Sequence, residues 1–192
     1  MNVLKSVLVA AVVMSSISAF AADKMGKMGK AEKTVEVGGA AMYPSKNIIE
    51  NAVNSKDHTT LVAAVKAAGL VDTLSGAGPF TVFAPTNAAF DKLPAGTVDT
   101  LVKPENKATL TKILTYHVVS GKMDSKAIAA AIKAGKGKAV VKTVQGEELT
   151  ASMKGKDLVL TDSKGGTSMV TIADVYQSNG VIHVVDTVLM PK

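Results

Sequence analysis

Cysteine is absent from the 192-residue chain, and so is arginine, because all 22 basic residues are lysine. Without cysteine there can be no disulfide, zinc–thiolate site, iron–sulfur cluster, thiol nucleophile or lipid anchor on an amino-terminal cysteine. Without arginine there is no bidentate guanidinium for guanine or phosphate, so the net charge of +6 is a weak argument for nucleic-acid binding. Tryptophan is also absent, and aromatic residues at 4% leave few stacking platforms for bases or sugars. We therefore expect no nucleic-acid partner.

The first 21 residues have the order of a secretory signal peptide. Lys5 supplies a positive charge, residues 7–14 form an apolar run, and residues 19–21 (AFA) match a small-x-small cleavage site. The apolar run is shorter than the roughly 20 residues that a membrane-spanning helix needs. We therefore expect residues 1–21 to be removed and the chain to be exported to the periplasm or beyond. A retained amino-terminal anchor is the alternative.

Residues 22–42 are rich in lysine and glycine and repeat Met-Gly-Lys over residues 25–30. No apolar period is evident there, which predicts a flexible basic leader. Such an arm could contact anionic surfaces weakly, and the alternative is a copper(I) site on Met25 and Met28. The remaining positive charge is expected to be spread over the domain. Membrane contact is then limited to the transient signal peptide and weak surface electrostatics.

A single folded domain is expected over residues 43–192, with helices first and strands later. Apolar spacing and capping residues predict helices over 45–53, 58–68, 70–74, 86–93, 97–102, 105–115 and 124–134. Alternation and glycine-containing turns predict strands over 80–84, 116–119, 139–144, 149–153, 157–161, 168–176 and 181–189. This order favours an α+β fold over a doubly wound parallel sheet. Asn179-Gly180 predicts a hairpin turn in which both central residues have positive φ.

Three segments carry a resemblance to a known family. Residues 78–90 (GPFTVFAPTNAAF) and 179–191 (NGVIHVVDTVLMP) resemble the two signature boxes of the fasciclin domain family, and residues 113–119 (ILTYHVV) resemble its tyrosine–histidine stretch. The resemblance implies a twisted β-wedge of mostly antiparallel strands with a cluster of short α-helices. It also implies a structural role for the matching motif residues. These are Phe80, Thr81, Phe83, Pro85, Thr86, Phe90, Asn179, Gly180, His183 and Asp186.

The same resemblance implies adhesion or extracellular matrix contact rather than catalysis. In animal members the tyrosine–histidine stretch and an Asp-Ile pair are implicated in integrin binding. Tyr116 and His117 match the first, while Asp174 and Val175 stand in place of the second, with valine for isoleucine. These four residues are the interaction candidates. The expected partner is an unknown surface protein or polysaccharide, and the expected state is a monomer or weak homo-oligomer.

A catalytic or metal site is not expected from the histidines. His183 and Asp186 are three apart on an expected strand, where side chains alternate between faces, so they cannot simply pair. His58, His117 and His183 lie far apart in the sequence and lack the spacing of metal ligands. His117 and His183 sit among apolar strand residues, which indicates structural hydrogen bonding. We expect no enzyme activity, no metal and no cofactor.

One alternative function remains, a carrier of a small hydrophobic ligand such as a pigment in an apolar groove. The aromatic residues of the first box are the natural lining of such a groove. Phe80 and Val82 share one strand face and Phe83 lies on the other. Both faces would be covered if Phe83 faced the helices and the other two faced the opposing sheet.

Overall fold

The computed structural model describes residues 33–192, which form one compact unit. The expected signal peptide and the Met-Gly-Lys repeat lie outside the described residues. The α-helices are α1 (Ile48–Ala52), α2 (Thr59–Ala68), α3 (Val71–Ser75), α4 (Asn87–Asp91), α5 (Thr97–Leu101), α6 (Lys107–Tyr116) and α7 (Ser125–Ala134). Short 3₁₀ turns cover Lys56–His58 and Pro104–Asn106. The strands are β1 (Val35–Val37), β2 (Ala40–Met42), β3 (Phe80–Pro85), β4 (Val118–Ser120), β5 (Lys138–Lys142), β6 (Glu148–Lys154), β7 (Asp157–Thr161), β8 (Thr167–Gln177) and β9 (Gly180–Val185).

The main sheet has seven strands in the order β4-β3-β9-β8-β7-β6-β5. All of its pairs are antiparallel except β3 with β9, whose register runs from Phe80 opposite Gly180 to Pro85 opposite Val185. The two outer strands approach each other at one end, where the Val144 amide donates to the Val118 carbonyl at 2.7 Å. The sheet therefore curls into a wedge that is almost closed at that end, which confirms the α+β expectation.

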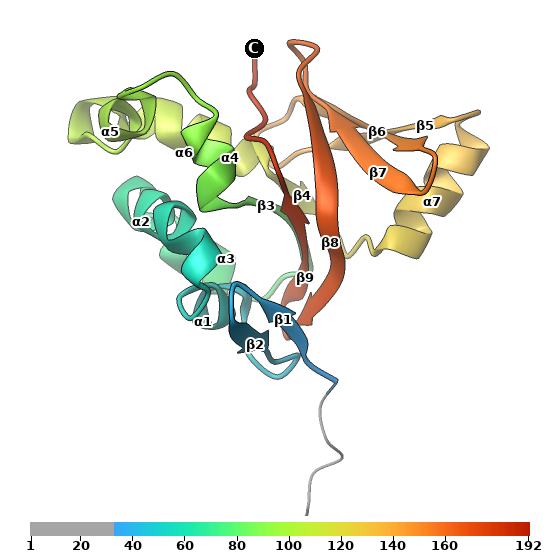
Figure 1. Ribbon diagram of the computed structural model, residues 1–192, viewed down its shortest axis with the longest axis horizontal. Coiled ribbons are helices and arrows are strands. Elements are labelled where there is room, and N and C mark those ends of the chain that lie inside the picture. The colour runs from blue at the N-terminus through green and yellow to red at the C-terminus, as the bar shows by residue number, and fades with distance from the viewer. Residues whose placement is uncertain (1–32) are drawn as a thin grey trace, which may run out of the picture. The chain divides into compact units, whose positions relative to one another are not determined.

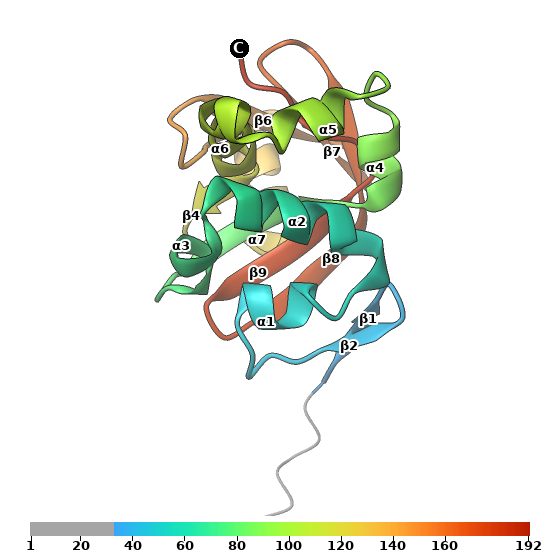
Figure 2. The same ribbon diagram turned by 90° about the vertical axis from the view of Figure 1, so that its left-hand side faces the viewer.

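The helices cover the wedge unequally. Helices α1 to α6 lie together on one side, whereas α7 lies at the other end against β5 and β6 (Figure 1). Helix α2 packs on α6, and Figure 2 shows both in front of the sheet. The chain thus has a helical side and an α7 side, separated by the central strands.

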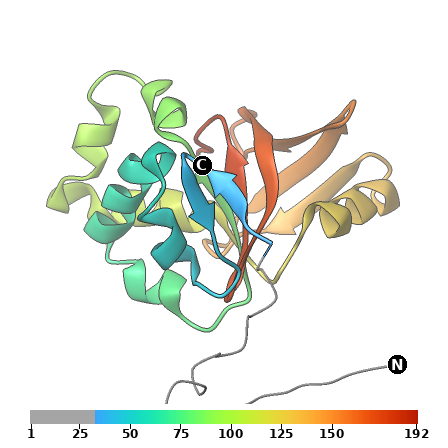
Figure 3. The same cartoon turned by 60° about the horizontal axis from the view of Figure 1, so that its bottom comes forward.

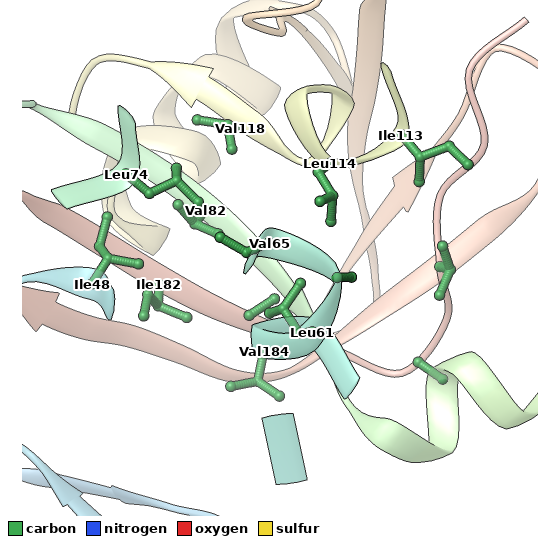
Figure 4. Packing of buried hydrophobic residues seen from close by; sticks show 14 of the residues in the cluster. Ile48, Leu61, Val65, Leu74, Val82, Ile113, Leu114, Val118, Ile182 and Val184 are labelled. Carbon is green, nitrogen blue, oxygen red and sulfur yellow. The ribbon is translucent and has the colours of Figure 1, made fainter. Parts of the chain in front are cut away.

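Each side has its own buried core, and β3 contributes to both. Val82 and Ala84 point into the helical core with α2 and α6, as Figure 4 shows for Val82 beside Val65 and Leu114. Phe83 points the other way, into the second core formed with α7 and strands β5 to β7. The alternation of side chains along β3 was predicted, but Phe83 faces the α7 core and Val82 faces the helices, the reverse of the arrangement considered from the sequence.

The predicted boundary between the flexible leader and the domain, at residue 42, is placed too far along the chain. Residues 35–42 form an antiparallel hairpin, with Val35 opposite Met42, and its turn uses positive φ at Gly38 and Gly39. Val37 and Met42 are only 2% and 3% exposed. Strand β2 contacts α1 and β8, so the hairpin covers one end of the helical core (Figure 3). This part of the leader belongs to the domain, because its apolar residues are buried.

The hairpin between β8 and β9 was predicted correctly, but the predicted turn geometry is wrong. Gln177 lies opposite Gly180, so the two central residues are Ser178 and Asn179, and neither they nor Gly180 has positive φ. The Asn179 side chain instead joins three segments. Its Oδ1 accepts from the Ile48 amide at 3.1 Å, and its Nδ2 donates to the carbonyls of Leu74 and Gly76 at 2.7 and 2.9 Å.

Candidate interaction surface

The second-box histidine, His183, is fully buried. Its Nε2 lies 2.9 Å from the Met123 carbonyl, its Nδ1 accepts from the Asp174 amide at 3.4 Å, and its ring stacks on Phe83. Burial lowers the pKa of His183, so the neutral ring is favoured. Both ring nitrogens serve the backbone, which leaves none for chemistry with a bound molecule.

His117, in the tyrosine–histidine stretch, is used in the same way. Its Nδ1 lies 2.9 Å from the Ile113 carbonyl, and its Nε2 accepts from the Leu189 amide at 3.0 Å. Complete burial lowers the pKa of His117 to about 4. The side chain therefore ties the end of α6 to the carboxyl-terminal segment as a neutral group.

Tyr116 is also fully buried, so it does not reach the surface. Its hydroxyl donates to the Glu148 carbonyl at 3.0 Å and accepts from the Ser163 amide at 3.0 Å. Burial raises the pKa of Tyr116. The tyrosine–histidine pair is thus part of the packing in this structure and is not exposed to a partner.

Asp174 and Val175 lie where β8 bulges, since the pairing with β9 shifts between Ile172 and Val175. Asp174 has φ +60°, and its carboxylate accepts from both the backbone amide and the hydroxyl of Ser125, at the start of α7. Val175 is only 1% exposed. The pair therefore fixes α7 to the sheet, and of the four interaction candidates only Asp174 has appreciable exposure.

The remaining motif residues serve local structure. Thr81 donates to the Gly121 carbonyl at 2.7 Å and accepts from the Met123 amide at 2.8 Å. Thr86 caps α4 by accepting from the Ala89 amide at 3.3 Å. Phe83, Pro85 and Phe90 are buried, and Phe80 is partly buried against the helical core.

Asp186 and His183 do not pair, as the strand geometry predicted. The Asp186 carboxylate accepts from the Met169 amide at 2.8 Å and faces the Lys92 ammonium at 3.3 Å. Within residues 33–192 no group of three or more histidine or carboxylate side chains is placed to hold a metal ion. None of the helices in that range is both long and apolar enough to cross a membrane.

A small apolar cavity lies in the helical core, beneath the β1–β2 hairpin. It has a volume of about 40 Å³ and is lined mainly by aliphatic side chains, including Val37, Met42 and Ile182. Ligand pockets are usually about 300–1,000 Å³, so this cavity is far too small for a pigment as it stands. Its one unsatisfied polar atom is Nε2 of His58, which faces the Ala84 backbone without a hydrogen bond of normal geometry.

Exposed lysines lie in or beside the turn after α7 and the turn between β6 and β7, at a place here called the basic end. It consists of Lys133, Lys136, Lys138, Lys154 and Lys156, all exposed. The two ion pairs found in the described chain, Lys92–Asp186 and Lys112–Glu147, involve none of them. Most lysines of the domain lie elsewhere, as expected, but the fold brings together these five, which lie up to 23 positions apart in the sequence.

Alanine in place of His183 should lower the melting temperature by several degrees. The substitution leaves the Met123 carbonyl and the Asp174 amide buried without their partner and opens a cavity beside Phe83. Thermal unfolding followed by circular dichroism measures the shift. An unchanged melting temperature would remove the structural role assigned to this histidine.

Comparison with known proteins agrees with the arrangement of the two boxes. The model of the Fasciclin domain matches residues 56–191. Protein sll1483 of Synechocystis is 48% identical over 169 residues, covering 87% of this chain and 86% of that protein. Cell surface glycolipoprotein MPB83 of Mycobacterium bovis is 35% identical over 179 residues, covering 89% of this chain and 74% of that protein.

Among solved structures, the chain is similar to a FAS1 domain pair from the insect cell adhesion molecule fasciclin I. The TM-score is 0.45 at 21% identity, and the match covers 73% of this chain and 43% of that chain, so this chain spans less than half of the pair. The family assignment depends on the sequence matches instead, which extend over most of the described domain. The chain therefore belongs to the fasciclin domain family.

Proposed function

We propose that this chain is an exported, non-enzymatic fasciclin-domain protein that acts in cell adhesion or in contact with surface and matrix polymers. The matched family indicates no catalytic activity, and one relative is a cell surface glycolipoprotein. The motif histidines are neutral and bonded to backbone groups, so they are not assembled into catalytic machinery. These features support a role in binding rather than in chemistry.

The observation that carries the proposal is the basic end. None of the five exposed ammonium groups takes part in an ion pair within residues 33–192. Uncompensated charge of one sign attracts partners of the opposite sign and speeds their encounter. A surface rich in anionic groups is therefore the natural counterpart of this side of the molecule.

Cell fractionation and an adhesion assay test the proposal together. The full chain should appear in the envelope or medium without residues 1–21, whereas a chain lacking those residues should stay in the cytoplasm. A strain deprived of the protein should attach less to surfaces or to other cells. Cytoplasmic location of the full chain, or adhesion unchanged by its loss, would overturn the proposal.

The carrier alternative has less support, because the cavity is far below the usual size of a ligand pocket. Binding of a pigment would require the β1–β2 hairpin to move away from the helical core, exposing Val37 and Met42. A visible absorption band in protein purified from its source would favour the carrier. A colourless preparation favours adhesion.

A further inference from the structure

Helix α7 ends in a turn that places a lysine where the backbone favours glycine. The Gly137 amide donates to the Ile132 carbonyl at 2.8 Å, and the Lys136 amide donates to the Lys133 carbonyl at 3.2 Å. These two bonds define a Schellman ending, in which the residue with left-handed conformation is usually glycine. Here that residue is Lys136, with φ +54°. A side chain is therefore kept at a position where it strains the backbone.

The neighbouring turn brings more lysines to the same place. Lys138 pairs with Ser152 across β5 and β6, and Lys154 pairs with Asp157 across β6 and β7. The turn after α7 and the turn between β6 and β7 are consequently next to each other at one end of the sheet. Asp157 is the one carboxylate that this pairing brings to the five lysines, so their mutual repulsion is little relieved.

The face of β5 and β6 beside these turns carries hydroxyl groups and the exposed Val140, but no aromatic or leucine side chain. Ser152 lies directly opposite Lys138, and Thr150 lies opposite Val140, so these four side chains share one face. Val140 and Met153 are the exposed large apolar residues of β5 and β6. Membrane-surface binding usually needs tryptophan, phenylalanine or leucine in addition to charge. Ammonium groups beside hydroxyls instead match a polymer that carries both carboxylates and hydroxyls.

We propose that the basic end binds a carboxylate-bearing polysaccharide, with Lys136 kept in its strained position for that contact. This proposal rests on the proposed surface function and specifies the class of partner that the basic end binds. Lysine suits such a partner, because a flexible point charge can follow carboxylates that repeat along a chain without a fixed fork geometry. The binding is electrostatic and must weaken as salt rises.

Two variants with equal net charge separate position from total charge. In the first, Lys133, Lys138 and Lys156 become glutamine at the basic end. In the second, Lys56, Lys66 and Lys103, which are exposed on the helical side, become glutamine. Each set includes one lysine in the last turn of a helix, Lys133 in α7 and Lys66 in α2. Binding of the mature chain to alginate, with neutral dextran as the blank, should fall at least ~10-fold in the first variant. It should change little in the second.

Lys136→Gly tests whether the lysine side chain at this strained position contributes to binding. The variant should fold, because glycine adopts positive φ without steric cost. Glycine relieves the left-handed conformation, so the melting temperature should stay the same or rise by about 2 °C. Affinity for alginate should nevertheless fall several-fold, with a weaker dependence on salt. Loss of binding together with higher stability is a result that a purely structural lysine would not give. Unchanged affinity in Lys136→Gly would overturn the role of this residue.

The remaining outcomes distinguish a failure of the proposed partner class from a failure of the proposed function. Stronger binding to phosphatidylglycerol vesicles than to alginate would overturn the polysaccharide and favour a lipid surface. Equal loss in the two glutamine variants would overturn the basic end as a site. If the protein attaches to cells but not to alginate, the surface function stands and the proposed partner class is wrong. If the protein is not exported, the proposed function fails whatever alginate shows.

Discussion

Gly180→Ala should lower the melting temperature by about 10 °C, which corresponds to a loss of about 3 kcal/mol. A Cβ at this position would stand 2.1 Å from the Phe80 carbonyl oxygen, in the parallel pairing of β3 with β9. The clashing atom belongs to the backbone, so β3 and β9 would have to move apart to accommodate the alanine methyl group. The substitution therefore weakens the pairing on which both cores depend.

Gly76→Ala is the matched control, because it tests alanine at a nearby glycine without this clash. Gly76 has φ −65°, and the nearest atom to its Cβ would be the Thr73 carbonyl oxygen at 3.2 Å. We expect a change of less than about 1 kcal/mol there. Similar melting temperatures for the two variants would contradict the close approach of β3 and β9.

Stability should fall steeply as the pH drops from 6.5 toward 4, by about 3 kcal/mol from His117 alone. In the unfolded chain this histidine takes up a proton near pH 6.5, whereas in the folded chain burial holds its pKa at about 4. The unfolded state therefore binds the extra proton in this range. The contribution is fully present above pH 6.5 and is lost as the pH approaches 4. Burial also lowers the pKa values of His58 and His183, which act in the same direction.

Urea unfolding at several pH values measures this dependence, and His117→Gln is the variant to compare. Glutamine can accept from the Leu189 amide but takes up no proton, so its stability should vary less between pH 6.5 and 4. Glu147 acts in a lower range. The Lys192 amide, with Ser163, lowers the pKa of Glu147 from 4.5 to about 2, so its contribution persists down to pH 4.5. Identical slopes for the two proteins would refute the buried neutral state of His117.

The elements that depend on local pattern were predictable from the sequence. The cap at Asp124, the stop at Gly135 and the glycine-containing turns delimit α7 and strands β5 to β8 closely. The strand register and the face on which each β3 side chain lies depend on the pairing of β3 with β9. These two strands are far apart in the sequence, so no local pattern predicts their pairing. The β1–β2 hairpin was missed because its strands have three residues each, although Gly38-Gly39 between short apolar stretches was an available signal.

The last strand was expected to run to residue 189 but ends at Val185. The Asp186 amide still donates to the Met169 carbonyl of β8 at 3.1 Å, but amides farther along bond to side chains instead of a neighbouring strand. The Leu189 amide donates to His117, the Met190 amide to Asp162 and the Lys192 amide to Glu147. Such acceptors come from distant parts of the sequence, so alternation of apolar residues could not reveal where pairing stops.

The candidate site was less predictable than the fold. Residues taken as interaction candidates from the resemblance proved to be mostly buried, because the motif preserves packing. The basic end was missed, since its lysines come from α7, β5 and the β6–β7 turn and no single segment carries the cluster. Only the antiparallel register puts Lys136 and Lys138 near Lys154 and Lys156.

Retention of the mature chain on intact cells, measured as salt rises, tests the central claim most directly. The natural chain and the variant with glutamine at Lys56, Lys66 and Lys103 should both be retained at low salt and released as salt screens the charges. The variant with glutamine at Lys133, Lys138 and Lys156 should be retained poorly at every salt concentration. Equal retention of the two variants, or no retention of the natural chain, would contradict surface attachment through the basic end.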